Sequence, residues 1–382
     1  MIYLDHNATT PLCGEAREAM LPLLGDLLGN PSGIHAHGRR ARAAVDDARD
    51  SIAAILGAKS HELIFTSGGT ESCNLALLGL SRRHRTAEKN HLITTASEHH
   101  AVLHAMRALK EKEGFELTEI PVNERGLVEP EVFAAALRPG TILASVMIAN
   151  NETGVIQSVE QLAAISRERG VLFHTDAVQA FGKMECLPHQ LGVDALSAAS
   201  HKFYGPHGAG FLWLRSGVSI DSIQHGGFHE NERRPGTENV AAIAGMAVAA
   251  RVAMAEVERG SEAPRQEALR ERLWHGITST DPSAIRNSSR APVLANTLNV
   301  SFPGCDGETL LMGLDLEGVS ASSGSACMVG SIQASHVLLA MGVPEERARA
   351  TVRFSLGRHT SDADIDAALE ALTRVLSRQH RS

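Results

Sequence analysis

Glu62-Leu-Ile-Phe-Thr-Ser-Gly-Gly-Thr-Glu-Ser72 decides the fold class of this 382-residue chain. A short apolar run ends in two glycines and gives way to the helical pattern Asn74-Leu-Ala-Leu-Leu-Gly-Leu80. A strand, a glycine turn and a helix in this order are typical of α/β proteins. The free N–H groups at such a helix start can bind a phosphate, although a plain capped turn has the same sequence. No Gly-Lys-Ser/Thr follows, so the turn is not a P-loop.

The same alternation of short apolar runs and helical stretches continues along the chain. It implies a mostly parallel sheet that is covered by helices on both faces. In such a sheet, ligands bind at the carboxyl ends of the strands. The predicted strands are 62–66, 91–95, 141–148, 170–175, 194–198 and 208–215, and the predicted helices include 36–56, 159–169 and 239–260.

The pattern changes after the Ala-rich helix, and we expect a second, smaller α+β domain there. Residues 298–302 and 350–355 have the composition of strands. The last helix is predicted to begin at Ser361, with Asp364 three residues on in a variant of the capping box. The expected division is a large domain over residues 15–255 and a small domain made of residues 1–14 and 256–382.

Composition and charge narrow the class of protein. Hydrophobic residues make up 43% of the chain, as in ordinary globular proteins. The net charge of −8 argues against nucleic acid as the main partner, because phosphate binding needs a clustered basic face. No apolar run is expected to approach the ~20 residues that span a bilayer. The start of the chain lacks the basic and apolar regions of a signal peptide. We therefore expect a cytoplasmic protein that contacts neither nucleic acid nor membrane.

The five cysteines are scattered and form no C-x-x-C pair, which argues against a disulfide framework and a zinc site. Cys327 lies in Ala321-Ser-Ser-Gly-Ser-Ala-Cys-Met-Val-Gly330, a run of small residues that predicts a mobile loop with an exposed thiol. His100 and His104 would share a helix face, but no H-E-x-x-H frame surrounds them. We expect no metal site and a reactive Cys327.

Two charged residues follow predicted strands. Asp176 ends one of them, where a carboxylate needs a cationic partner, although helix capping is the commoner role of such an Asp. Lys202 comes just after another, where burial would make its amine nucleophilic, although a lysine in a turn is more often on the surface. A phosphate-binding turn, a carboxylate for a ring nitrogen and a buried lysine are together what pyridoxal phosphate (PLP) requires.

The chain resembles the cysteine desulfurases of the class V aminotransferase family, in the branch of the nitrogen-fixation and iron–sulfur assembly enzymes. The resemblance implies the PLP-dependent transferase fold type I, with a large mostly parallel sheet domain and a smaller α+β domain. It runs nearly end to end and rests on segments 3–11, 29–32, 66–72, 150–154, 236–239, 322–327 and 353–358.

The resemblance also implies a role for each site residue. Lys202 would form the Schiff base with PLP, and Cys327 would receive the substrate sulfur. His99 would stack on the ring and assist proton transfer, and Asp176 would pair with the ring nitrogen. The remaining implied contacts are Gly69, Thr70 and His201 with the phosphate, Thr237 with the phosphate in the neighbouring subunit of a homodimer, Gln179 with the phenolic oxygen, and Asn151 and Arg353 with the substrate carboxylate.

The implied reaction converts L-cysteine to L-alanine and leaves a persulfide on Cys327. Freed Lys202 would remove the α-proton, and the Cys327 thiolate would attack the substrate sulfur. The persulfide would then pass to a sulfur-acceptor protein, either an iron–sulfur scaffold or a thiolation relay. Two other functions stay open: a selenocysteine lyase or other class V lyase or aminotransferase, and a non-catalytic sulfur-carrier subunit.

Two positions depart from the family pattern. Ala199 stands where relatives often have a serine that contacts the phosphate, and Ser200 is the candidate that could compensate. Met328 and Val329 follow Cys327, where Thr-Ser is common, and they make the predicted loop more apolar.

Overall fold

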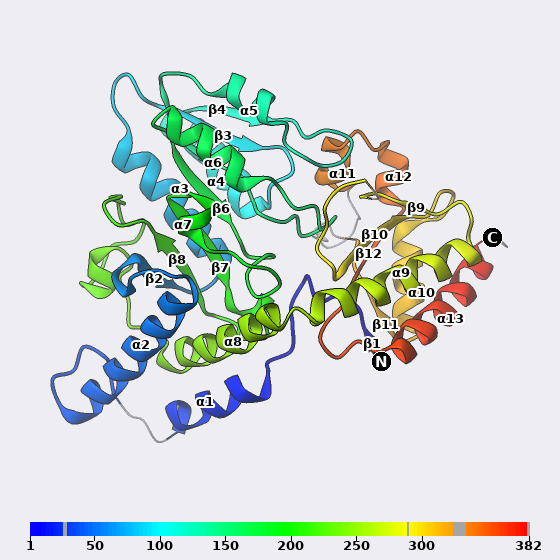
Figure 1. Cartoon of the computed structure of the whole chain (residues 1–382), viewed down its shortest axis with the longest axis horizontal. Helices are drawn as coiled ribbons and strands as arrows, with labels where there is room; N and C mark the ends of the chain where they lie inside the picture. The colour runs from blue at the N-terminus through cyan, green and yellow to red at the C-terminus, as the bar shows by residue number, and fades with distance from the viewer. Residues whose placement is uncertain (26–28, 289, 324–333, 380–382) are drawn as a thin grey trace.

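The computed structural model describes residues 1–25, 29–288, 290–323 and 334–379. In this part of the chain the large sheet has seven strands in the order β2-β8-β7-β6-β5-β3-β4 (Figure 1). Strands β3 to β7 pair with one another in parallel, whereas β8 is antiparallel to both of its neighbours, β2 and β7. The predicted mostly parallel sheet is confirmed. The strands are β2 (Leu63–Thr66), β3 (His91–Thr95), β4 (Glu116–Ile120), β5 (Thr141–Ser145), β6 (Leu172–Asp176), β7 (Ala195–Ala199) and β8 (Gly210–Leu214).

Helices cover this sheet on both faces, as the apolar strands require. Leu92 and Leu143 belong to one buried apolar cluster, and the next residues, Ile93 and Ala144, belong to another. Successive side chains of a strand point to opposite faces, so the two clusters are the two sides of the sheet. The helices of this part are α1 (Gly14–Gly25), α2 (Ala36–Ile55), α3 (Gly69–His84), α4 (His100–Glu113), α5 (Pro130–Ala136), α6 (Val159–Glu168) and α7 (Pro188–Leu191).

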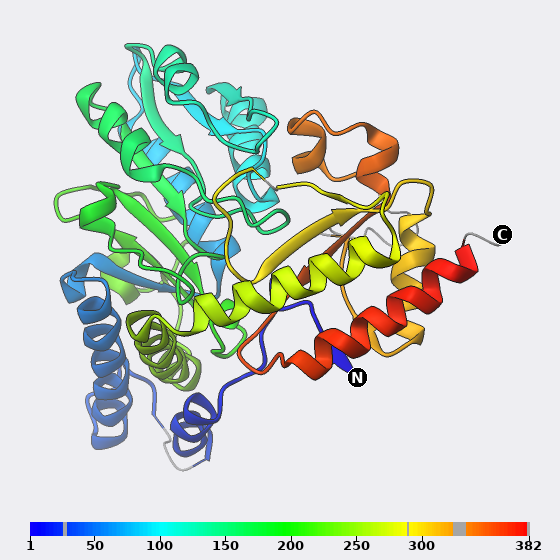
Figure 2. The same cartoon turned by 45° about the vertical axis from the view of Figure 1, so that its right-hand side comes forward.

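A smaller sheet follows, in which β10 (Thr297–Ser301) pairs antiparallel with β12 (Thr351–Ser355) and β9 (Ile285–Arg286). The chain start returns to this region. There β1 (Ile2–Tyr3) pairs with β11 (Val319–Ser320) in a separate two-stranded sheet, and Leu4 is buried in the same apolar cluster as β10 and β12. Helices α9 (Glu262–Thr280) and α13 (Asp362–Gln379) lie side by side against this sheet (Figure 2). The remaining helices are α10 (Gly307–Leu316), α11 (His336–Ala340) and α12 (Glu345–Arg349).

Helix α8 (Val240–Arg259) connects the two sheets and corrects one expectation. It is long and apolar enough to span a bilayer, with a mean hydropathy of 1.7, so the sequence does contain such a run. However, 56% of that window is buried, and α8 packs against α1 and α2. A helix that is apolar on nearly all sides fits a protein core equally well. Helix α8 is therefore a core helix, and the division near residue 255 that we expect inside it stays a prediction.

Candidate active site

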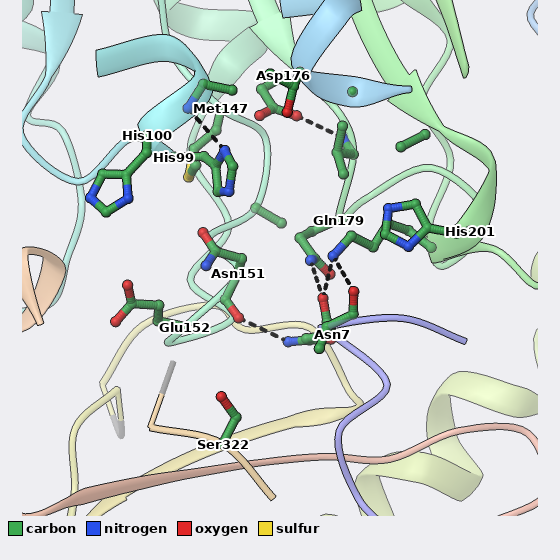
Figure 3. Close-up of a pocket in the computed structure, with 18 of the residues that line it drawn as sticks. Asn7, His99, His100, Met147, Asn151, Glu152, Asp176, Gln179, His201 and Ser322 are labelled. Carbon is green, nitrogen blue, oxygen red and sulfur yellow. Dashed lines mark hydrogen bonds between the residues drawn. The ribbon is translucent and has the colours of Figure 1, made fainter. Parts of the chain in front are cut away.

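A cavity of about 460 Å³ opens at the carboxyl ends of β5, β6 and β7, between the large and the small sheet (Figure 3). This is the edge at which α/β sheets bind ligands. Residues from distant parts of the chain meet there, including the small-sheet residues Ser322 and Arg353. The predicted site residues that line this cavity are Gly69, Thr70, His99, Asn151, Asp176, Gln179, His201, Lys202 and Arg353.

One end of the cavity is formed by the start of α3. Gly68 precedes the helix with φ of 151°, in the region that favours glycine. A Cβ on Gly69 would come within 2.7 Å of Cγ2 of Val178, the second residue after the end of β6, so a side chain at position 69 would collide with it. The first N–H groups of a helix lack intrahelical acceptors, and the helix dipole favours an anion there. With His201 nearby, this end of the cavity suits a phosphate.

Lys202 enters the cavity from a short 3₁₀ turn (Ser200–Lys202) that follows β7. Its Nζ donates hydrogen bonds to the main-chain oxygens of Asn7 (2.6 Å) and Ala8 (2.7 Å). Burial, and then the positive charge of Arg353, lower the pKa of Lys202 to about 8. About a tenth of its amine is therefore unprotonated at pH 7, far more than for a lysine with an ordinary pKa, and an unprotonated amine is a nucleophile and a base.

Asp176 is the last residue of β6 and is 6% exposed. Its Oδ1 accepts a hydrogen bond from the Val178 N–H at 2.8 Å. Burial raises the pKa of Asp176 to about 6, although hydrogen bonds and Lys202 act against that rise. A carboxylate at the bottom of a cavity with so raised a pKa lacks a close countercharge. A cationic ring nitrogen would supply it.

His99 caps the start of α4, and its Nδ1 accepts the Ala101 N–H at 3.1 Å. Burial, and then the charge of Lys202, lower the pKa of His99 to about 4, so the ring is neutral at physiological pH. In a neutral ring whose Nδ1 accepts, the proton is on Nε2. His99 therefore offers the cavity a flat, neutral ring with one N–H donor (Figure 3).

Arg353 lies in the middle of β12 and is 3% exposed. It forms an ion pair with Asp5 at 2.6 Å and donates to the main-chain oxygen of Asn151 at 2.9 Å. Its Nε is buried without an acceptor among the described residues. A guanidinium with an unused donor at the edge of a cavity suits a carboxylate.

The structure does not bring two predicted cofactor residues to the cavity. Ser200 is not among the described residues that line it; a Cβ on Gly205 would come within 2.1 Å of the Ser200 Oγ, so this hydroxyl faces Gly205. Ala199 lines the cavity, but it offers no hydrogen bond. Thr237 is exposed and lines a different, smaller cavity beside Ser67. Cys327, with Met328 and Val329, lies outside the described residues.

Sequence reasoning missed Asn7 and Lys183. Asn7 is 1% exposed, and its main-chain oxygen accepts from Gln179 Nε2 (2.8 Å) as well as from Lys202. Lys183 reaches Asn7 from the opposite side. The only hint of Lys183 is its position four residues after Gln179. Asn7 lies in the quoted segment 3–11, but it follows no strand and opens no helix, so no pattern marked it.

The imidazole rings of His100 and His104 stack at a centroid distance of 4.8 Å, and His336 stacks on the other side of His100 at 4.7 Å. Among the residues that the structure describes, no group of three or more His, Cys, Asp or Glu side chains is placed to hold a metal ion.

The chain is similar to a known protein family, to curated proteins and to solved structures over nearly its whole length. The model of the family described as aminotransferase class-V matches residues 2–368. The chain is 46% identical over 377 residues to cysteine desulfurase IscS of Dictyoglomus turgidum (99% of this chain, 95% of the relative) and 43% identical to that of Methanosarcina thermophila (99% and 92%). The structure is similar to a solved NifS-like protein, with a TM-score of 0.92 and 36% identity over 99% of both chains. It is also similar to SspA solved in complex with cysteine, with a TM-score of 0.81 and 34% identity over 94% of this chain and all of that one.

Proposed function

Because the chain belongs to the class V aminotransferase family, and within it to the cysteine desulfurases, we propose that this cavity removes the sulfur of L-cysteine, leaves L-alanine and places the sulfur on Cys327. The chain is a PLP-dependent enzyme of fold type I. The observation that carries the proposed site is the meeting of Lys202, Asp176 and His99 around one cavity. A buried amine, a buried carboxylate and a neutral ring serve three different parts of one ligand.

The residues of the cavity fit PLP. The start of α3 and His201 would hold the phosphate, and Asp176 would face the ring nitrogen. Lys202 would bond to the aldehyde carbon, and Gln179 would contact the phenolic oxygen. When bound, PLP withdraws electrons from the α-carbon of an amino acid attached to it.

The protein side chains then have separate tasks. Arg353 and Asn151 would bind the substrate carboxylate and so fix which bond faces the cofactor. Lys202, whose pKa is lowered to about 8, would accept the α-proton at Nζ. The Cys327 thiolate would form an S–S bond with the substrate sulfur while the C–S bond breaks, and the carbon fragment would leave as alanine after it gains a proton.

The other cysteines support the assignment of Cys327. None of Cys13, Cys73, Cys186 and Cys305 is among the described residues that line the cavity. Burial raises the pKa of Cys186 to about 12 and that of Cys73 well above its usual range, so both are poor nucleophiles. Ser322 lines the cavity, and Cys327 is five residues further along the chain.

The proposal includes a homodimer, a cytoplasmic location and a sulfur-acceptor protein. Thr237 is exposed on its own subunit, which suits a residue that reaches the phosphate of a neighbouring one. Two exposed apolar side chains lie in the same region. Phe228 is 83% exposed, and Ile34 is 92% exposed. A hydrogen bond between His229, the residue after Phe228, and Ser32 brings the two segments together. A second copy of the chain would cover this surface.

The proposed function is tested by incubating the PLP-loaded protein with L-cysteine and a thiol reductant. We expect alanine and sulfide in equal amounts, and without reductant a protein-bound persulfide on the tryptic peptide that contains Cys327. Alanine from L-selenocysteine but not from L-cysteine would replace the proposal with a selenocysteine lyase. Neither product, in a protein that lacks a visible absorption band after addition of PLP, would support a non-catalytic subunit.

Asp176→Asn is expected to weaken PLP binding by about 10- to 100-fold, the value of a buried charge-assisted hydrogen bond. The pKa of Asp176 is raised to about 6, so in the apoprotein the carboxyl is neutral below that pH and ionised above it. Only the ionised form attracts a cationic ring nitrogen, so PLP affinity of the parent should rise with pH through about 6, and this rise should be absent in the variant. Equilibrium dialysis of the apoproteins between pH 5 and 7.5 measures both. Equal PLP affinity and equal pH dependence in the parent and Asp176→Asn would contradict the role of Asp176 as the partner of the ring nitrogen.

A further inference from the structure

Lys183 is a second, half-buried lysine beside this active site, and no carboxylate among the described residues forms an ion pair with it. Its Nζ donates to the side-chain oxygens of Gln179 (2.8 Å) and Asn7 (3.1 Å). Burial, and then the charges of Lys202 and Arg353, lower the pKa of Lys183 to about 7, and no carboxylate is among the causes. Holding an amine there costs free energy, so its position calls for an explanation beyond packing.

The contacts of Lys183 determine how the Gln179 amide is oriented. An ammonium group only donates, so the amide oxygen of Gln179 must face Lys183. The amide nitrogen then faces the opposite way, where it donates to the Asn7 main-chain oxygen at 2.8 Å and borders the cavity (Figure 3). The Asn7 main-chain oxygen can only accept, so Asn7 and Lys183 hold the Gln179 amide in the same orientation. In this orientation the amide offers the cavity a donor.

Asn7 joins the two lysines. Its side-chain oxygen accepts from Lys183 and its main-chain oxygen accepts from Lys202 at 2.6 Å. Small-sheet residues hold Asn7 in place: Asn296 Nδ2 donates to its side-chain oxygen (3.0 Å), and its Nδ2 donates to Thr297 Oγ1 (2.9 Å). The two amines are thus fixed on opposite sides of one rigid residue.

We propose that Lys183 is a positioning residue of this active site, which together with Asn7 holds the Gln179 amide as a donor toward the cofactor. This inference rests on the proposed function, because it assigns Lys183 a role only if this cavity binds PLP.

Lys183 loses its proton before Lys202 does, because the pKa of Lys183 (about 7) lies below that of Lys202 (about 8). Lys202 therefore titrates beside a mostly neutral Lys183, and Lys183 acts through its hydrogen bonds. The charged groups that act on Lys202 are Arg353, which lowers its pKa, and Asp5 and Asp176, which raise it. On its far side Lys183 lines a second cavity with His6 and Arg358 and with the acidic residues Glu256, Glu262 and Glu267.

The test uses the full-length apoprotein and measures how fast it takes up PLP, by visible absorbance, between pH 6 and 10. In the parent we expect the rate to rise with a midpoint near 8, where Lys202 loses its proton. In Lys183→Met and Lys183→Gln the midpoint should stay near 8, because Lys183 is already mostly neutral at that pH. It should also stay there in Lys112→Met, a matched change on the exposed face of α4. An upward shift in the two Lys183 variants alone would contradict the proposal, because it would mean that Lys183 acts through its charge.

A second measurement separates charge from orientation. Lys183→Gln can still donate to the Gln179 oxygen and should bind PLP nearly as well as the parent, whereas Lys183→Met cannot and should bind it about tenfold more weakly. A thermal melt of each apoprotein checks that it is folded. Equal PLP affinity of Lys183→Met and the parent, in folded protein, would overturn the proposal while the function of the cavity stands. Failure of the parent itself to take up PLP would instead contradict the proposed function.

Discussion

Replacing Cys327 by alanine is expected to abolish sulfide release from L-cysteine, while PLP stays bound and its visible absorption still responds to the substrate. The residues that would hold cofactor and substrate, such as Asp176 and Arg353, line the cavity independently of this thiol. Without a thiolate to accept it, the sulfur cannot leave the carbon. We expect kcat to fall by on the order of a thousandfold or more. Parallel assays of sulfide, alanine and the absorption spectrum measure these effects.

Two other cysteines provide the controls for this experiment. Cys13 and Cys305 are both partly exposed free thiols away from the cavity, so Cys13→Ala and Cys305→Ala should retain parental rates. Burial, and then Asp281, raise the pKa of Cys305, which makes it a weak nucleophile. Desulfuration by Cys327→Ala at the parental rate, or its loss in Cys305→Ala, would transfer the sulfur-accepting role to another thiol.

The sequence was sufficient to predict the architecture but not the direction of every strand. A buried antiparallel strand such as β8 has the same uninterrupted apolar run as its parallel neighbours, so only the pairing distinguishes it. Strand β4 was not predicted because it lies at the edge of the sheet and carries two glutamates. The start of α13 was predicted well, since capping depends on local residues: Ser361 N donates to Asp364 Oδ2 at 2.8 Å, and Asp364 N donates to Ser361 Oγ at 3.2 Å.

In the active site too, residues with a local sequence signal could be predicted, and residues that depend on contacts between distant segments could not. Asp176 and Lys202 could be located because Asp176 ends a buried strand and Lys202 comes shortly after another, and strand ends converge at one edge of the sheet. Asn7 could not, because it acts partly through its main-chain oxygen, which any residue type possesses. Ser200 was a candidate by its position next to Ala199, but adjacent residues at a turn point in different directions, and its hydroxyl faces Gly205. Lys183 can be recognised as part of the site only from its hydrogen bond to Asn7 in the folded chain.

Replacing Lys202 by alanine is expected to remove the covalent link to PLP and to lower sulfide production by about 10²- to 10⁴-fold, the range typical of a lost general base. In the structure Lys202 is the amine that enters the cavity at the end of β7, with its pKa lowered to about 8. Reduction of the PLP-loaded parent with borohydride should fix the cofactor to one tryptic peptide, the one containing Lys202. In Lys202→Ala no peptide should carry it, although PLP should still bind reversibly through its phosphate and ring nitrogen.

Lys183 makes this experiment discriminating, because its amine is also close to Asn7 and has a pKa lowered to about 7. By pKa alone, Lys183 would be the more reactive amine. Geometry favours Lys202, since Lys202 lines the cavity and Lys183 donates both to Gln179 and to the far side of Asn7. Cofactor fixed to the Lys183 peptide in the parent would contradict the assignment of Lys202. Lys110→Ala, which removes an exposed amine in the last turn of α4, should retain parental labelling and activity.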